Sequence, residues 1–254
     1  MITVNNLAFH YKGHPVLKDI SFKARKGEIL SILGPNGTGK TTLLNCLLNI
    51  NVPDKGSISI DDKNIRAYSL RDMAQTIAYV PQSFDSVGFN SISVFQNILM
   101  GRTPFIEGGY TKEDRKKVFE ILQSMGLQEL AFKPLNQISG GERQRTYIAR
   151  AIAQDPQIIL LDEPTSSLDI QNQLNAMKII EKLVRTENIT AIMTMHDINL
   201  ASLYSDTIIL LKDGYVFVTG TPAEVLTVES IKAVYHIDTQ ITLVDGKPEI
   251  LLKK

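Results

Sequence analysis

Residues 34–41 read Gly-Pro-Asn-Gly-Thr-Gly-Lys-Thr, a spacing that suits the binding of phosphate groups. Glycines let the backbone turn tightly, so that successive N–H groups point at anionic oxygens, and a helix that follows adds the partial positive charge of its first turn. Lys40 would reach the β- and γ-phosphates of a nucleotide, and the Thr41 hydroxyl would ligate Mg²⁺. The residues expected to contact the nucleotide here are Gly34, Pro35, Asn36, Gly37, Thr38, Gly39, Lys40, Thr41 and Thr42.

Two adjacent carboxylates, Asp162 and Glu163, end the apolar run Ile-Ile-Leu-Leu. Neighbouring residues of a strand point to opposite faces, so the two carboxylates can have different tasks. We expect Asp162 to hold Mg²⁺ through water and Glu163 to orient the attacking water or to take its proton. An acidic pair at a strand end is often only a helix cap or a solvated edge. Together with the phosphate loop (residues 34–41), however, it predicts a site that hydrolyses a nucleotide.

Both groups need strands and helices to position them. Short apolar runs at residues 28–33, 76–80, 157–161, 189–194 and 207–211 predict strands that are covered on both faces. Residues 40–48 and 170–184 have helical periodicity. The apolar stripe of the second helix consists of Ile170, Leu174, Met177, Ile180 and Val184. This alternation predicts an α/β fold with a mainly parallel sheet, in which the acidic pair lies beside the phosphate loop.

Three regions depart from that alternation. Residues 2–10, 16–23 and 57–61 predict a small N-terminal antiparallel β-subdomain. Between residues 93 and 150 strand signals are nearly absent; Thr111 and Asp114 suggest a capping box, and a helical stripe of Val118, Ile121, Leu122 and Met125 follows. We therefore predict one domain over residues 1–254, with an inserted helical subdomain at about 83–155. Residues 220–254 predict two short helices, at 222–226 and 230–235, and a hairpin of residues 240–244 with 249–252.

Composition excludes several classes of protein. The 254 residues carry 27 basic and 27 acidic side chains, so no general electrostatic attraction to nucleic acid is expected. Cys46 is the only cysteine, which rules out an internal disulfide. No apolar stretch approaches the roughly 20 residues of a membrane helix, and no signal peptide is recognisable at the start. If the chain works at a membrane, we expect it to do so by binding another chain.

Residues 139–144, Ser-Gly-Gly-Glu-Arg-Gln, resemble the Leu-Ser-Gly-Gly-Gln signature of the ATP-binding-cassette (ABC) family. Ile138 and Glu142 depart from that pattern, but the small residues that give a second anion-binding helix start are kept. The run lies just before a helix that we expect over residues 144–154. The resemblance implies a P-loop NTPase (RecA-like) fold, with ATP and Mg²⁺ as ligands. It also implies roles for residues elsewhere in the chain. Gln82 would sense Mg²⁺ and the attacking water, His196 would touch the γ-phosphate, Tyr11 would stack on adenine, and Asp169 would belong to the loop after the acidic pair.

The same resemblance implies a mechanism in which two such domains close head to tail on two ATP molecules. Ser139 and Gly141 of one copy would then meet the γ-phosphate held by Lys40 of the other, and Gly140 would also belong to the nucleotide-binding residues. Because the chain has one phosphate loop and one signature run (residues 139–144), it must pair with another copy or a partner. A homodimer is the simpler expectation.

Residues 94–104 and 220–227 are similar to importer ATPases that serve iron-siderophore, haem and cobalamin permeases, although Ser167 stands where many of these chains carry histidine. We expect a subunit on the cytoplasmic face of the cell membrane, indirectly served by a periplasmic or surface solute-binding protein. Residues 83–102 would dock the permease through Phe84, Val87, Phe89 and Phe95. The alternatives are a molybdate/tungstate or other ABC transporter, an exporter ATPase, and a soluble cassette ATPase of repair, translation or signalling. The last usually carries long coiled coils or a second cassette, which this chain lacks.

Overall fold

The computed structural model describes residues 1–82, 91–166 and 168–253. The chain forms two compact units: Met1–Tyr68 with Val184–Lys254, and Ser69–Leu183. Each unit is described by itself below. The predicted strand–helix alternation is present in both, with parallel strand pairs in each unit and an antiparallel sheet at the N-terminus.

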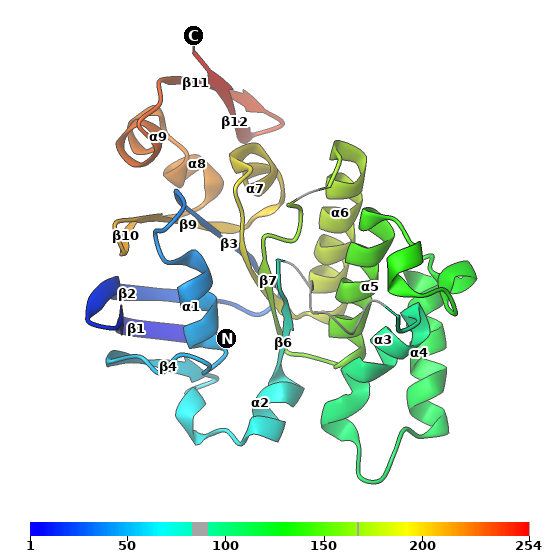
Figure 1. The fold of residues 1–254 in the computed structure, drawn as a ribbon. Helices are drawn as coiled ribbons and strands as arrows, with labels where there is room; N and C mark the ends of the chain where they lie inside the picture. Colours follow the sequence, from blue (N-terminus) through cyan, green and yellow to red (C-terminus); the bar gives the residue numbers. More distant parts are fainter. Residues whose placement is uncertain (83–90, 167, 254) are drawn as a thin grey trace. The chain divides into compact units, whose positions relative to one another are not determined.

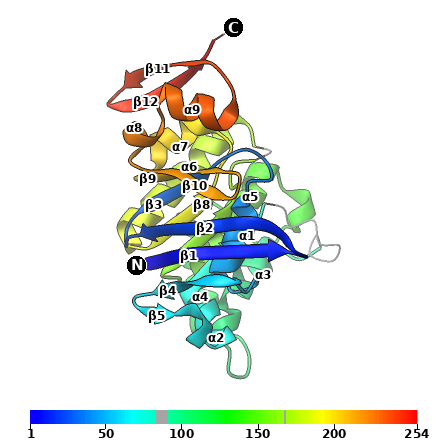
Figure 2. The ribbon, with the colours of Figure 1, turned by 90° about the vertical axis from the view of Figure 1, so that its left-hand side faces the viewer.

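The first unit opens with an antiparallel sheet of order β2-β1-β4-β5 (Figure 2). Its strands are β1 (Ile2–Tyr11), β2 (His14–Ala24), β4 (Lys55–Ile60) and β5 (Lys63–Asn64), and a 3₁₀ turn, η1 (Ile65–Ala67), follows. Along β1 and β2 the buried positions are apolar and the exposed ones mostly polar, as in a sheet with one face on the core. The predicted N-terminal β-subdomain is confirmed.

A second sheet of this unit has the order β10-β9-β3-β8. Strand β3 (Ile29–Leu33) lies parallel to β8 (Thr190–Thr194) and to β9 (Thr207–Lys212), and all residues of β3 and β8 are buried. Strand β10 (Tyr215–Gly220) runs antiparallel to β9 and was not predicted. Helix α1 (Lys40–Leu47) follows the phosphate loop and carries Cys46, which is fully buried; burial is the main cause that raises the pKa of its thiol to about 12.

The C-terminal part of the first unit contains helices α7 (Ile198–Tyr204), α8 (Pro222–Val225) and α9 (Val228–Tyr235). Strands β11 (Thr239–Val244) and β12 (Lys247–Leu252) form a hairpin that packs beside α7 (Figure 1). The two predicted short helices and the predicted hairpin are therefore present. Their core side chains include Val225, Ile231 and Val234.

The second unit pairs β6 (Ile77–Val80) in parallel with β7 (Ile158–Asp162). Helix α2 (Leu70–Thr76) precedes β6. The predicted insert consists of α3 (Val94–Leu99), α4 (Lys112–Ser124), α5 (Gly140–Ala153) and the 3₁₀ turns η2 (Met100–Phe105), η3 (Gln128–Leu130) and η4 (Leu135–Gln137). No strand occurs in the described residues 91–153, the capping box of Thr111 and Asp114 is confirmed, and the predicted stripe of α4 and Met125 is buried.

Three details differ from the sequence-based expectation. Helix α5 begins at Gly140, directly after Ser139, and not at Gln144, because the Ser139 side chain already caps the helix there. Helix α6 (Ile170–Glu187) buries Met177, Ile180 and Val184, but Ile170 is 76% exposed because it occupies the first position of the helix, outside the packed face. Phe95 is buried between Phe119 and Phe132 instead of lining a surface. Among the described helices, none is long and apolar enough to cross a membrane.

Candidate nucleotide site

The phosphate loop connects β3 to α1 in the first unit and folds around the side chain of Lys40. The Lys40 ammonium group donates hydrogen bonds to Gly34 O (2.8 Å) and Pro35 O (3.2 Å), and the side chain is almost fully buried. The Thr38 hydroxyl donates to Pro35 O at 2.9 Å. A buried ammonium group beside a helix N-terminus is an arrangement that suits an anion.

Three glycines of this loop have backbone conformations that favour glycine, and two of them are also closely packed. Gly34 and Gly39 have φ values of 151° and 98°, which L side chains rarely adopt. A Cβ at Gly34 would lie 2.6 Å from Leu211 O, and one at Gly39 would lie 2.8 Å from a methyl group of Leu17. At Gly37 (φ 82°), in contrast, an added Cβ would meet nothing within 4 Å. The loop therefore packs tightly against β9 and β2 at Gly34 and Gly39 and is open at Gly37.

His196 lies at the same edge of the sheet as the start of the phosphate loop. In the parallel pair of β3 and β8, Ile32 is opposite Thr194, and the Met195 N–H donates to Ile32 O at 3.1 Å. His196 is the next residue and its side chain is exposed. Because Gly34 follows Ile32 by two residues, the structure brings together two predicted site residues that are far apart in the sequence.

Tyr11 is at the end of β1, with 49% of its surface exposed. Its ring meets the edge of Phe9 at a centroid distance of 5.0 Å and an interplanar angle of 87°. The Asn51 amide donates to the Tyr11 hydroxyl at 3.4 Å. A half-exposed ring that contacts Phe9 and Asn51 offers apolar surface, which stacking on adenine would require.

In the second unit, the ends of β6 and β7 bring Gln82 to Glu163. Val80 is opposite Leu161 in the parallel pair, and each candidate residue follows two positions later. The Gln82 amide donates to a carboxylate oxygen of Glu163 at 2.5 Å. Sequence reasoning expected both residues at the attacking water, and the structure joins them directly.

Asp162 has a neighbour that sequence reasoning missed. Tyr79 on β6 hydrogen-bonds with the Asp162 carboxylate, and burial followed by the nearby carboxylate raises the pKa of Tyr79 to about 12. Asp162 itself is buried. A neutral phenol is thereby kept as a partner of this carboxylate at physiological pH. The sequence gives little indication of this contact, because a tyrosine within a strand is common and does not by itself point to a carboxylate partner.

The signature run starts α5 with a capping box. The Ser139 hydroxyl accepts the N–H of Glu142, and the Glu142 carboxylate accepts the N–H of Ser139 at 2.7 Å. These bonds to Ser139 hold the pKa of the Glu142 carboxyl below its usual range. Glutamate at this position, which departs from the family pattern, thus makes the same backbone contact that a glutamine would make.

Asp169 is joined to the signature run through Asn172. The Asp169 carboxylate accepts the backbone N–H and the side-chain amide of Asn172, both at 2.8 Å. These bonds lower the pKa of Asp169. The Asn172 amide oxygen in turn lies 2.3 Å from where a Cβ of Gly141 would be, so a larger residue there would have to displace the Asn172 side chain. Ser167, in the same loop, lies outside the described residues.

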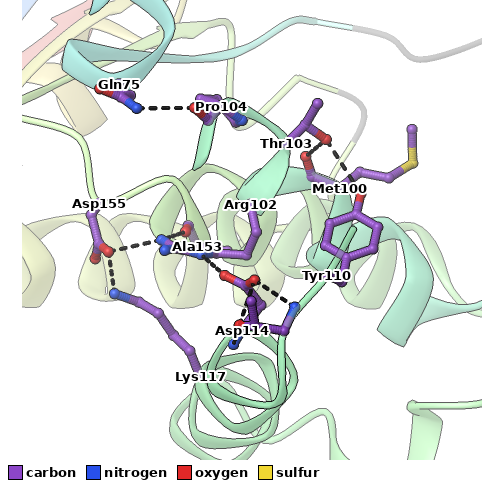
Figure 3. Close-up of polar contacts among 11 residues, drawn as sticks. Gln75, Met100, Arg102, Thr103, Pro104, Tyr110, Asp114, Lys117, Ala153 and Asp155 are labelled. Carbon is purple, nitrogen blue, oxygen red and sulfur yellow. Dashed lines mark hydrogen bonds and ion pairs between the residues drawn. The ribbon is translucent and has the colours of Figure 1, made fainter. Parts of the chain in front are cut away.

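Arg102 anchors the far end of the signature helix (Figure 3). Its guanidinium group donates to Asp114 on α4 (2.9 Å), to the α5 carbonyl of Ala153 (2.8 Å) and to Asp155 (2.9 Å). Lys117 forms a second ion pair with Asp155. The insert therefore holds α5 at both ends, by capping at Ser139 and by Arg102 at its last turn.

Known proteins match this chain over nearly its whole length. The sequence profile of the ABC transporter family matches residues 17–166. An uncharacterized ABC transporter ATP-binding protein of Methanocaldococcus jannaschii is 42% identical, over 99% of this chain and 97% of that protein. The petrobactin import ATP-binding protein YclP of Bacillus subtilis is 34% identical over 97% of both chains.

A solved structure is similar as well. A metal-chelate type ABC transporter in an inward-facing conformation superposes with a TM-score of 0.85 and 33% identity, over 99% of this chain and 96% of that chain. The fold thus agrees with the sequence comparisons. The chain belongs to the ABC transporter family as an ATP-binding subunit with ATPase activity, and it resembles the ATPases of metal-chelate importers.

Proposed function

We propose that this chain hydrolyses ATP to drive the uptake of a metal chelate through a membrane permease. The observation that carries the proposal is the folded phosphate loop with the buried ammonium group of Lys40 at its centre. Residues 34–42 would bind the phosphates, and Tyr11 would stack on the adenine. The donors of the loop are backbone N–H groups and one cation, which suit a polyphosphate.

Glu163 is our candidate for the base that orients and deprotonates the attacking water. Its bond to Gln82 supports this role, because the amide holds one oxygen of the carboxylate in a fixed position. His196 would donate to the γ-phosphate. Thr41, Gln82 and Asp162 offer the hydroxyl and carbonyl or carboxylate oxygens that Mg²⁺ prefers, and the ion would neutralise phosphate charge when bound.

The chain would act as a homodimer with two shared sites. In this arrangement the helix start at Ser139, Gly140 and Gly141 of one copy faces the ATP held by the other copy. The capping box supports this proposal, because it fixes the first turn of α5 with its N–H groups at the tip of the helix. Asp169 would support that tip through Asn172.

Permease docking is proposed for residues 83–102. Phe84, Val87 and Phe89, which motivated this prediction, lie outside the described residues, and the described part consists of α3 and the start of η2. Docking would hold the ATPase at the cytoplasmic face of the membrane, with a solute-binding protein acting on the other side. Support for import comes from the similarity to a petrobactin import protein and to a metal-chelate type transporter.

The test is reconstitution of the chain with its permease and binding protein in proteoliposomes. ATPase stimulation and uptake would be measured with ferric siderophores, haem, cobalamin and molybdate, and the Glu163→Gln variant would serve as the control without turnover. We expect stimulation by a metal chelate. Stimulation by molybdate alone would overturn the substrate class. A chain that never co-purifies with a permease under native extraction would overturn the transport role and favour a soluble ATPase.

A further inference from the structure

The C-terminal hairpin is bonded to the helix that directly follows His196. The side-chain amide of Asn199 donates to Ile250 O at 3.1 Å, and the Ile250 N–H donates to the Asn199 amide oxygen at 2.8 Å. One side-chain amide thereby bonds both the N–H and the C=O of Ile250, as the backbone of a neighbouring strand would do. The Ser202 hydroxyl adds a bond of 2.6 Å to Pro248 O.

These bonds hold the first turn of α7. Asp197 caps the helix by accepting the N–H of Leu200 at 2.9 Å, and Asn199 is the second residue of the helix. His196 immediately precedes the cap. On its other side, Met195 is bonded to Ile32 of β3. The backbone of His196 is therefore fixed between β3 through Met195 and β12 through Asn199.

We propose that Asn199 is a positioning residue for hydrolysis, and that the C-terminal hairpin sets the place of the His196 imidazole through it. This inference rests on the proposed role of His196 at the γ-phosphate. Groups that act on a reacting phosphate must be held within a fraction of an ångström, and a displacement of about 1 Å can cost up to about 100-fold in rate. The hairpin thus belongs to the hydrolytic machinery and is more than a cover for the core.

Asparagine meets the geometry at this position because one side chain must both donate and accept. Alanine would leave the Ile250 N–H and C=O without this partner. Aspartate has the same size and still accepts the Ile250 N–H, but it places an oxygen opposite Ile250 O. Ser202 provides a matched comparison, since it bonds the same hairpin from the second turn of α7, farther from His196.

The experiment compares the full-length Asn199→Ala, Asn199→Asp and Ser202→Ala variants in steady-state ATP hydrolysis. We expect both Asn199 variants to lower kcat by roughly 10- to 100-fold with KM changed by less than about threefold, because the phosphate loop would supply most of the contacts to bound ATP. Ser202→Ala should lower the melting temperature but keep kcat within about twofold of the parent. Asn199→Asp covers the case in which the alanine variant does not fold.

A second measurement reports on His196 without activity. The chain has four histidines, so the ring signals in a ¹⁵N-histidine spectrum can be assigned with a His196→Ala variant. We expect the His196 signals to shift in the Asn199 variants and to stay in place in Ser202→Ala. Unchanged signals with kcat within twofold of the parent in the Asn199 variants would overturn the inference. If His196→Ala itself hydrolyses ATP normally, the proposed role of His196 fails instead.

Discussion

Glu163 has a backbone conformation that few residues other than glycine adopt. Its φ is 49°, at the turn where β7 ends, and Ser166 bonds back to its carbonyl through both N–H and hydroxyl. Such left-handed residues cost free energy and often mark functional sites. Here the turn directs the carboxylate to Gln82 on the neighbouring strand. The hydrogen bond between Glu163 and Gln82 therefore depends on the conformation of the turn as well as on the glutamate side chain.

We expect Glu163→Gln to bind ATP as the parent does and to hydrolyse it at least about 100-fold more slowly, because an amide of the same size cannot take a proton. Phosphate release would measure turnover, and a fluorescent ATP analogue would measure affinity. Lys40→Ala should instead weaken binding itself. Turnover of Glu163→Gln within a few-fold of the parent would show that another group activates the water.

Sequence reasoning reached the residues whose chemistry depends on a motif and missed those that depend on a neighbour. Residues 34–41 and the acidic pair are recognisable because phosphate binding by a loop, and two carboxylates at a strand end, each need residues of a fixed type at a fixed spacing. Tyr79 and Asn199 have no such signal, since a tyrosine in a strand and an asparagine in a short helix are ordinary. Tyr79 gains its partner from the pairing of β6 with β7, and Asn199 gains its partner from the packing of β12 beside α7.

The starts of helices α5 and α6 are in contact, and a single glycine makes this possible. A Cβ at Gly141 would lie 2.3 Å from the Asn172 amide oxygen, which Asp169 holds in place. We expect Gly141→Ala to lower the melting temperature and Gly140→Ala to do so much less, because its nearest contact would be at 4.0 Å. Asn172→Ala added to Gly141→Ala should restore part of the loss. Equal melting temperatures for Gly141→Ala and Gly140→Ala would contradict this account.

Arg102 offers a test of how η2, α4 and α5 are held together. Its side chain is 13% exposed and has three acceptors, so Arg102→Ala should lower the free energy of unfolding by about 3 kcal/mol. Lys117→Ala breaks a more exposed pair with the same Asp155 and should cost less than about 1 kcal/mol. Urea denaturation would measure both. A smaller loss for Arg102→Ala than for Lys117→Ala would contradict the assignment of Arg102 as the anchor.

The same cluster predicts a pH dependence. The hydrogen bond from Arg102, followed by the N–H of Thr111, lowers the pKa of Asp114. A carboxyl with a depressed folded pKa stabilises the protein above its unfolded pKa of about 4, and this contribution is lost as the pH falls through the lower folded value. We expect Asp114→Asn to reduce the slope of unfolding free energy against pH below about pH 4. An unchanged slope in urea titrations at several pH values would show that other carboxyls cause it.

Elements with strong periodicity were predictable to within a few residues. Buried strands such as β3 and β8 consist mainly of apolar residues, a composition that favours strands covered on both faces. Strand β10 was missed because its side chains alternate between exposed and half-buried positions with Tyr215 and Phe217 on the exposed side. The start of α5 was placed late because the glycines that open it lack helical propensity, and only the Ser139 cap identifies them.

If each ATP site is formed by the phosphate loop of one copy and the signature run of another, two inactive variants can complement each other. A site formed within one chain does not allow this. Lys40→Ala disables the phosphate loop but keeps the signature run, whereas Ser139→Phe does the reverse. Each variant alone should be nearly inactive. A mixture that exchanges subunits should regain activity, because the mixed dimer has one site with both elements intact.

The regained activity would be measured as phosphate release against the mixing ratio and should peak at equal amounts. Subunit exchange would be checked by size-exclusion chromatography with light scattering. If exchange occurs but the activity of the mixtures never exceeds the summed activities of the separate variants, the shared site is contradicted.

The predicted limits of the helical subdomain, about 83–155, stay a prediction. No periodicity in the sequence marks the division after Tyr68 and Leu183.

Cys46 makes the chain suitable for site-directed labelling. A fully buried thiol with a pKa of about 12 has almost no thiolate at neutral pH, so maleimide reagents will scarcely react with it in the folded protein. A spin label or dye attached to a new cysteine at an exposed position such as Phe132 or Leu243 would then be the dominant probe. Distances between two such labels could follow the ATPase cycle without removal of the native cysteine.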